Sequence, residues 1–290
     1  MPQMTPTPPD EEAATPLDTR LALLARSKRG FAPVRHTFVQ KPRNAKSPRS
    51  PRGSTLAALV NDHQERALDA LLILLGLEPV LGEDQPLEAA VWARALSDVP
   101  PKPAAVSRVW LQLESRGLVE RDRRARRALV RPRREDGKAR YTRPGQARAA
   151  SETGGWARDD WYFILPHAYW GLGLDQALPL AAKAMLLVSL QATSQNPSYY
   201  MRLEDAPSWY GLSEQTAARG IRGLREAGLL REHYQKIAAP VSPTGQATRT
   251  HYTLLKPFST EARHQLQAAT KRAVRRNAKG PKKASAKGRR

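Results

Sequence analysis

The sequence predicts a mainly α-helical α+β fold, in which two tandem domains each combine helices with a small β-hairpin between disordered basic termini. The length of 290 residues suggests about two domains. Residues 106–142 align with residues 217–253 without a gap, which indicates an internal repeat. The 24 prolines and 18 glycines, beside 40% hydrophobic residues, indicate long irregular stretches outside the folded parts.

These observations divide the chain into five segments. We expect a disordered N-terminal arm over residues 1–53 that is basic from residue 20, a first domain over 54–150, a connector over 151–174, a second domain over 175–260 and a basic C-terminal tail over 261–290. The tail is too polar to bury enough apolar surface to fold alone.

In each copy of the repeat, the aligned residues predict a helix that ends at a glycine. Apolar residues recur at helical spacing as Val106, Trp110 and Leu113 in the first copy and as Ala217, Ile221 and Leu224 in the second. Ser213 can cap the second helix, and Gly117 and Gly228 can adopt the left-handed conformation that terminates a helix. The preceding helices are predicted around residues 67–77 and 89–96 in the first copy, and around residues 180–190 and 206–212 in the second.

A two-stranded hairpin is predicted after each of these helices. In the first copy, Asp136-Gly137 is a strong turn dipeptide between residues 128–130 and the stretch around Tyr141. In the second copy, residues 242–245 form the turn before the alternating segment 251–254.

Residues 107–121, which read Ser-Arg-Val-Trp-Leu-Gln-Leu-Glu-Ser-Arg-Gly-Leu-Val-Glu-Arg, carry a resemblance to known DNA-binding proteins. They are similar to the recognition helix and first wing strand of MarR-like and GntR-like regulators, and residues 210–213 and 223–230 are similar to them too. The predicted order of two helices, a recognition helix and a two-stranded wing resembles the winged helix-turn-helix superfamily, which implies DNA binding. The first copy departs from this pattern at residues 99–103, where a proline-rich segment replaces the usual turn and Ser or Thr cap.

The formal net charge of +21 is concentrated in three stretches. Residues 20–53 hold ten basic and no acidic residues, residues 116–143 twelve basic and four acidic, and residues 271–290 ten basic and no acidic. Basic patches on folded domains with basic ends are typical of polyanion binders, because each Lys or Arg at a phosphate releases condensed counterions. We therefore expect double-stranded DNA as the partner. The alternative is that the basic runs only keep the protein soluble.

The predicted recognition helices carry arginine and glutamine opposite their buried stripes. Arginine matches the O6 and N7 atoms of guanine and glutamine matches N6 and N7 of adenine, so Arg108, Gln215, Arg219 and Arg222 are the candidates for base reading. At the position of Arg222 the first copy has Leu111. The residues that we expect to contact DNA are Lys102, Ser107, Arg108, Gln112, Arg123, Arg124, Arg126, Arg127, Gln215, Thr216, Arg219, Arg222, Lys236 and Arg249.

We predict a sequence-specific double-stranded DNA-binding protein, most simply a transcriptional regulator that reads a bipartite site with two recognition helices. Two winged helices in one chain also resemble the tandem architecture of plasmid replication initiators. Initiation at the iterons of a plasmid or mobile element is therefore the alternative, and a nonspecific nucleoid-associated protein is a further one. Association into a homo-oligomer is compatible with each function and required by none.

The connector over residues 151–174 is unusually aromatic, with six of the chain's 18 aromatic residues. Such a segment is too apolar for a free linker, so we expect it to pack on the domains and fix their relative orientation. The alternative is a stacking platform for the bases of single strands.

The sequence argues against several other functions. The absence of cysteine excludes disulfides and thiolate chemistry, which favours a reducing cytoplasm. Acidic residues at positions 10–12 argue against a secretory signal, and no apolar run approaches the roughly 20 residues needed to span a membrane. Paired histidines, phosphate-binding loops and nucleophile elbows are missing, so we expect no enzyme, no metal site and no cofactor. The expected location is the cytoplasm, in association with the nucleoid.

Overall fold

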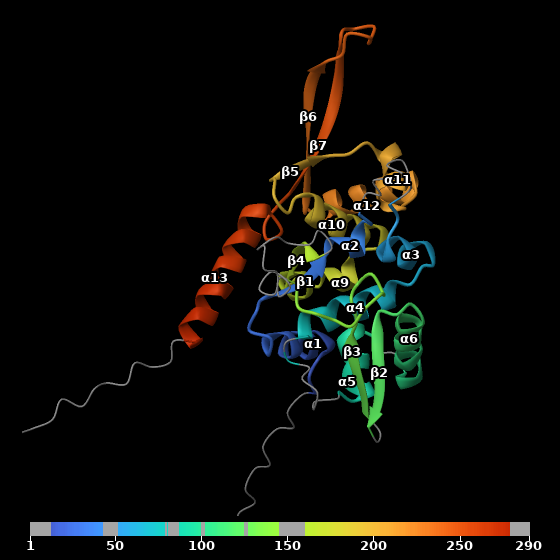
Figure 1. Ribbon diagram of the computed structural model, residues 1–290, viewed down its shortest axis with the longest axis vertical. Helices are drawn as coiled ribbons and strands as arrows, with labels where there is room; N and C mark the ends of the chain where they lie inside the picture. The colour runs from blue at the N-terminus through green and yellow to red at the C-terminus, as the bar shows by residue number, and fades with distance from the viewer. Residues whose placement is uncertain are drawn as a thin grey trace, which may run out of the picture.

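The computed structural model describes residues 13–42, 52–78, 80, 87–99, 102–124, 127–144 and 160–278. Over these residues the protein has a mixed α/β fold in which helix predominates and the sheets are small. Figure 1 shows helices α5 and α6 with strands β2 and β3 toward one end, and α11 and α12 with β5, β6 and β7 toward the other. Helix α4 and strands β1 and β4 lie between these two groups.

The first half of the chain contains α1 (Pro16–Ala25), β1 (Phe31–Arg35), α2 (His36–Val39), α3 (Thr55–Asn61), α4 (Glu65–Leu77), α5 (Ala89–Leu96), α6 (Pro103–Ser115), β2 (Val119–Arg124) and β3 (Arg127–Pro132). The second half contains β4 (Tyr162–Pro166), α8 (Ala168–Gly171), α9 (Leu174–Ala177), α10 (Leu180–Ala192), β5 (Ser198–Tyr200), the 3₁₀ helix η2 (Leu203–Asp205), α11 (Ala206–Tyr210), α12 (Glu214–Glu226), β6 (Leu230–Ala238), β7 (Gln246–Leu254) and α13 (Thr260–Ala278).

The repeat seen in the sequence has a structural counterpart in α6 and α12. The two helices begin and end at aligned positions, and each is followed by a glycine in the left-handed region, Gly117 with φ 70° and Gly228 with φ 68°. Strands β2 and β6 also begin at aligned positions, Val119 and Leu230. The aligned parts of the two halves are thus a helix followed by an antiparallel hairpin, and in the second half β5 widens the hairpin to the order β5-β7-β6.

The predicted turn at Asp136-Gly137 forms, but the predicted strands of the first hairpin on either side of it are wrong. Strand β2 pairs with β3 in the register that sets Val119 opposite Pro132 and Arg124 opposite Arg127, so the chain reverses between those two arginines. Val119 and Val130 are buried in the core in this pairing. Asp136-Gly137 forms a separate turn after β3, in which the Gly137 N–H donates to the Arg134 carbonyl oxygen at 2.8 Å.

The second hairpin is longer than the first, so the alignment of the two copies does not hold beyond β2 and β6. Strand β6 continues to Ala238 and β7 begins at Gln246. Val130 and Val241 are identical and aligned, yet Val130 is buried in β3 whereas Val241 lies in the turn and is fully exposed. The repeat therefore specifies the helix and the start of the hairpin, and the loop length of each copy sets the rest.

The predicted disorder of residues 1–53 is wrong for the described part of that segment. Helix α1, strand β1 and helix α2 fold into the body, and β1 pairs antiparallel with β4 so that Val34 lies opposite Phe163. Val34 and Phe38 are completely buried. The apolar residues of this segment find partners more than a hundred positions away, which local patterns do not reveal. Residues 1–12 and 43–51 lie outside the described residues.

The connector supplies part of this central layer. Within residues 160–174, β4 and α8 bury Phe163, Tyr169 and Trp170, whereas Trp161, directly before β4, remains 46% exposed. Trp156 lies outside the described residues. At the other end of the second half, α13 extends to Ala278, so a helix occupies much of the segment predicted as a disordered tail; residues 279–290 are not described.

One continuous hydrophobic cluster spans both halves. It includes Leu71 and Leu74 of α4, Val34 of β1, and Met185 and Leu186 of α10. Because these side chains belong to one core, the two hairpins are held in a fixed relation, at opposite ends of the longest axis of the molecule (Figure 1).

Candidate nucleic-acid interface

Helix α12 is fixed on α10 by a buried stripe and a close glycine contact. The stripe consists of Ala217, Ile221 and Leu224. Gly220 lies so near α10 that a Cβ atom at this position would be 2.3 Å from the carbonyl oxygen of Ala181. At the N-terminus, the Ser213 Oγ accepts a hydrogen bond from the Thr216 N–H at 3.1 Å and caps the helix. The packing and the cap together leave α12 with one defined solvent face.

That solvent face carries Gln215, Arg219 and Arg222, all of them exposed. Among the described residues, neither Arg219 nor Arg222 forms an ion pair. Arg225, one turn further along, pairs instead with Glu232 of β6 at 3.4 Å. The two unpaired guanidinium groups are therefore available to a ligand, whereas the third is already held by a carboxylate.

Helix α6 packs in the same way on the core of the first half. Its buried stripe consists of Val106, Val109, Trp110 and Leu113. Trp110 meets Trp92 of α5 edge to face, with ring centroids 4.9 Å apart. Lys102 stands at the N-cap without a side-chain hydrogen bond, and Pro103 occupies the first helical position. Proline favours this start because it has no N–H that needs a partner there.

The exposed face of α6 carries Ser107, Arg108, Leu111 and Gln112. Leu111 is 51% exposed, so an apolar side chain does stand at the position of Arg222. Arg108 and Gln112 line an open cavity of about 580 Å³ beside residues 62–67, where α4 begins. This arrangement places a cationic and an amide side chain along one groove next to the helix.

The four arginines predicted to lie along phosphates belong to the tip of the first hairpin. Arg123 and Arg124 occupy the end of β2 and Arg127 the start of β3, with Arg124 opposite Arg127. Their side chains, and all of Arg126, lie outside the described part of the structure.

Two arginines at the base of the same hairpin are neutralised by carboxylates. Arg121 pairs with Glu114 of α6 at 2.5 Å, and Arg133 pairs with Glu120 of β2 at 2.7 Å. The first pair joins the hairpin to α6, and the second links the end of β3 to β2. Part of the charge of residues 116–143 therefore stabilises the local fold and is not free for a polyanion.

The second hairpin does not bring Lys236 and Arg249 together, because the strand register places them on opposite faces. Arg249 stacks over the ring of Tyr200, 5.3 Å from its centroid, and the rings of His233 and His251 stack at 5.1 Å. Arg249, Tyr200, His233 and His251 thus share one face of the three-stranded sheet. This row was not predicted from the sequence, although the alternation of Arg249 and His251 along β7 indicates that these two side chains share a face.

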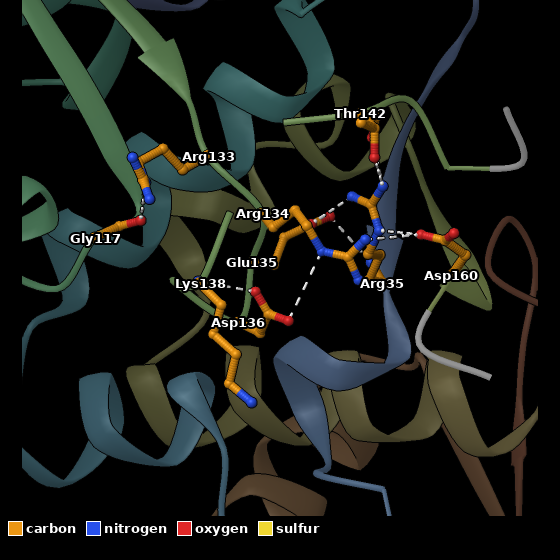
Figure 2. A network of polar contacts seen from close by, with 9 residues as sticks. All are labelled: Arg35, Gly117, Arg133, Arg134, Glu135, Asp136, Lys138, Thr142 and Asp160. Atoms are coloured by element: carbon orange, nitrogen blue, oxygen red, sulfur yellow. Dashed lines mark hydrogen bonds and ion pairs between the residues drawn. The ribbon is translucent and has the colours of Figure 1, made fainter. Parts of the chain in front are cut away.

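Two basic residues of the N-terminal stretch, Arg20 and Arg35, are internal. Figure 2 shows Arg35 surrounded by polar groups: its guanidinium donates to Glu135 Oε2 at 2.8 Å, to Asp160 Oδ1 at 3.1 Å and to Thr142 Oγ1 at 3.0 Å. Burial opposes the charged form, but the Glu135 carboxylate outweighs it and raises the pKa of Arg35. Asp160 also accepts from Arg134 at 3.1 Å. These charges compensate each other and do not contribute to the surface.

Arg20 and Arg263 are buried as well, the first beside carboxylates and the second against backbone carbonyls. Arg20 pairs with Asp98 at 2.6 Å and with Asp175 at 3.3 Å. Arg263 donates to the backbone carbonyls of Leu190 and Phe258, and burial lowers its pKa to about 10. The net charge therefore overstates the number of cations that the folded part presents to a partner.

Over the described ranges, no group of three or more His, Asp or Glu residues is arranged to hold a metal ion. The same ranges contain no helix that is long and apolar enough to cross a membrane. No family model, curated protein or solved structure matches the chain.

Proposed function

We propose that this protein binds double-stranded DNA sequence-specifically through α6 and α12, as the recognition helices of two tandem winged helix-turn-helix domains. The observation that carries the proposal is the equivalence of Arg108 and Arg219, which are exposed at aligned positions of two helices with aligned boundaries. Each helix buries an apolar stripe and leaves its polar face to solvent, as groove binding requires.

The chemistry of the two faces supports base reading. Arg219 and Arg222 are unpaired among the described residues and match guanine, and Gln215 matches adenine. On α6, Arg108 and Gln112 supply the same side-chain types and Leu111 matches a thymine methyl group. The hairpins then serve as wings that contact phosphates, and the biological role that we propose is transcriptional regulation in the nucleoid.

A selection of bound DNA from a random pool tests this proposal. If both helices enter one face of the duplex, the enriched motif should contain two half-sites separated by about 10 base pairs or a multiple of that number. Enrichment of no motif would contradict sequence-specific binding and would favour nonspecific binding to the nucleoid.

The second candidate function is replication initiation. The two reading faces differ, since α6 has Leu111 where α12 has Arg222, so one molecule reads an asymmetric site. Symmetric dimers read palindromes, whereas a protein that reads an asymmetric site binds repeats of that site in the same orientation, as in the iterons of an origin. Enrichment of tandem repeats in the selection, together with permanganate-reactive thymines near the bound repeats, would support initiation over regulation.

A further inference from the structure

A second candidate binding site lies between α13 and β4 and contains no residue of α6 or α12. The structure has a cavity of about 560 Å³ here, within the range of small-molecule sites. Strand β4 and α2 form one wall, the segment after α10 forms the floor, and α13 forms the other wall.

The β4 wall is aromatic. Trp161 is 46% exposed, and the ring of His36 meets it edge to face with centroids 6.3 Å apart. Phe163 also lies against His36, with ring centroids 6.0 Å apart. Burial lowers the pKa of His36 to about 4, so its ring is neutral at neutral pH and adds surface without charge. An exposed indole that is held against a neutral imidazole ring is a stacking surface for a planar ligand.

The α13 wall is cationic and polar. Arg263, Gln267 and Lys271 are four residues apart and lie on one face of the helix, toward the cavity. Arg263 is fixed by its hydrogen bonds to backbone carbonyls, whereas Lys271 is exposed. The described lining contains no Asp or Glu, so the site favours an anion.

We propose that this cavity binds a nucleobase that carries a phosphate. The base stacks on Trp161, the amides of Gln195 and Gln267 match the mixed donors and acceptors of a base edge, and Lys271 pairs with the phosphate. Such a unit comes either from a free nucleotide or from a nucleotide of single-stranded DNA. The inference rests on this cavity alone and does not depend on duplex binding by α6 and α12.

The test measures quenching of tryptophan fluorescence by adenosine monophosphate, adenosine, inorganic phosphate and a single-stranded oligodeoxynucleotide. We expect saturable quenching by the monophosphate, by the oligonucleotide or by both, and the stronger ligand identifies the source. Phosphate alone should not quench. Absence of saturable binding by both the monophosphate and the oligonucleotide would overturn the proposal.

Two variants make the test specific to this cavity. Lys271→Gln should weaken phosphate-bearing ligands about tenfold and leave adenosine unchanged. Trp161→Ala should abolish binding, which calorimetry detects without the fluorophore. Arg272→Gln changes a neighbouring exposed cation of the same helix that does not line the cavity and should have no effect. Undiminished binding in both test variants would overturn the proposal, and retained duplex binding in them would show that DNA recognition by α6 and α12 is a separate property.

Discussion

Lys183 of α10 and Asp69 of α4 form a buried ion pair, with Nζ and Oδ2 2.8 Å apart and both side chains at least 92% buried. Glu65 accepts a second contact from the same Nζ at 2.8 Å. The pair joins the helix at the centre of the first half to the helix on which α12 packs. It therefore links the positions of the two proposed recognition helices.

Replacing Lys183 with Met should destabilise the protein by about 3–5 kcal/mol at pH 8, because Asp69 would then be buried without a partner. Burial already raises the pKa of Asp69 to about 7 against the opposing effect of Lys183, with Glu65 and Asp175 also raising it. The destabilisation caused by Lys183→Met should therefore be smaller at pH 5, where Asp69 is protonated and carries no charge that needs a partner. Urea unfolding followed by circular dichroism measures both values. The double variant with Asp69→Leu should recover most of the stability, and equal losses at both pH values would refute this account.

His167 should make the pH dependence of stability run in the opposite direction. Burial lowers its pKa to about 4 from 6.5, with a smaller contribution from Arg29. A base whose pKa is lowered by folding contributes stability that is present above pH 6.5 and lost as the pH falls through 4. The difference in the free energy of unfolding between the wild type and His167→Gln should therefore narrow by roughly 3 kcal/mol from pH 7 to pH 4. A difference that does not vary with pH would show that His167 does not titrate in this range.

The helices of the repeated units, α4, α5 and α6 in the first half and α10, α11 and α12 in the second, were predictable because local patterns specify them. Spacing of three and four residues marks the buried stripes of α6 and α12, and Gly117 and Gly228 mark their ends. The exposure of Arg108 and Arg219 follows from the same periodicity.

What the sequence did not reveal depends on contacts between distant residues. Strand β1 pairs with β4, although more than a hundred residues separate the two strands in the sequence. In the sequence Arg35 is one more cation of a basic stretch, and only the fold shows that Glu135 and Asp160 surround it. The turn dipeptide Asp136-Gly137 misled the hairpin prediction because it does form a turn, but one that follows β3.

The contact between α12 and α10 predicts that Gly220→Ala is more damaging than Gly223→Ala. A Cβ at Gly220 would lie 2.3 Å from the Ala181 carbonyl oxygen, whereas a Cβ at Gly223 would lie 3.1 Å from the nearest atom, the Cβ of Ala182. The first substitution has to move α12 off α10 and should cost about 1–3 kcal/mol more than the second. Denaturant unfolding of the two variants measures this difference. Equal stability would show that the helices do not pack as closely as described.

The proposed function predicts different effects for two arginines of α12. Arg219→Ala should cost roughly 1–3 kcal/mol on the selected DNA site and relax base choice at one position. Arg225→Ala is the matched control, because Arg225 is held by Glu232 and should contribute little to base choice. Fluorescence anisotropy with selected and random duplexes compares the variants. A loss for Arg219→Ala that is the same on both duplexes would exclude base reading by this residue.

Deletion of residues 279–290 should weaken binding to all DNA sequences to a similar extent. This segment contains six basic residues and no acidic residue, and it begins after the end of α13, so its removal spares every described element. Each phosphate contact that is lost reduces the slope of the logarithm of affinity against the logarithm of salt concentration by about 0.9, and six contacts would reduce it by about five. Titrations of the full and shortened chains between 50 mM and 200 mM salt measure the two slopes.

The motif enriched from a random DNA pool should stay the same after the deletion, because phosphate contacts add affinity without choosing bases. An unchanged slope would show that these residues do not contact DNA, and a changed motif would show that they read sequence.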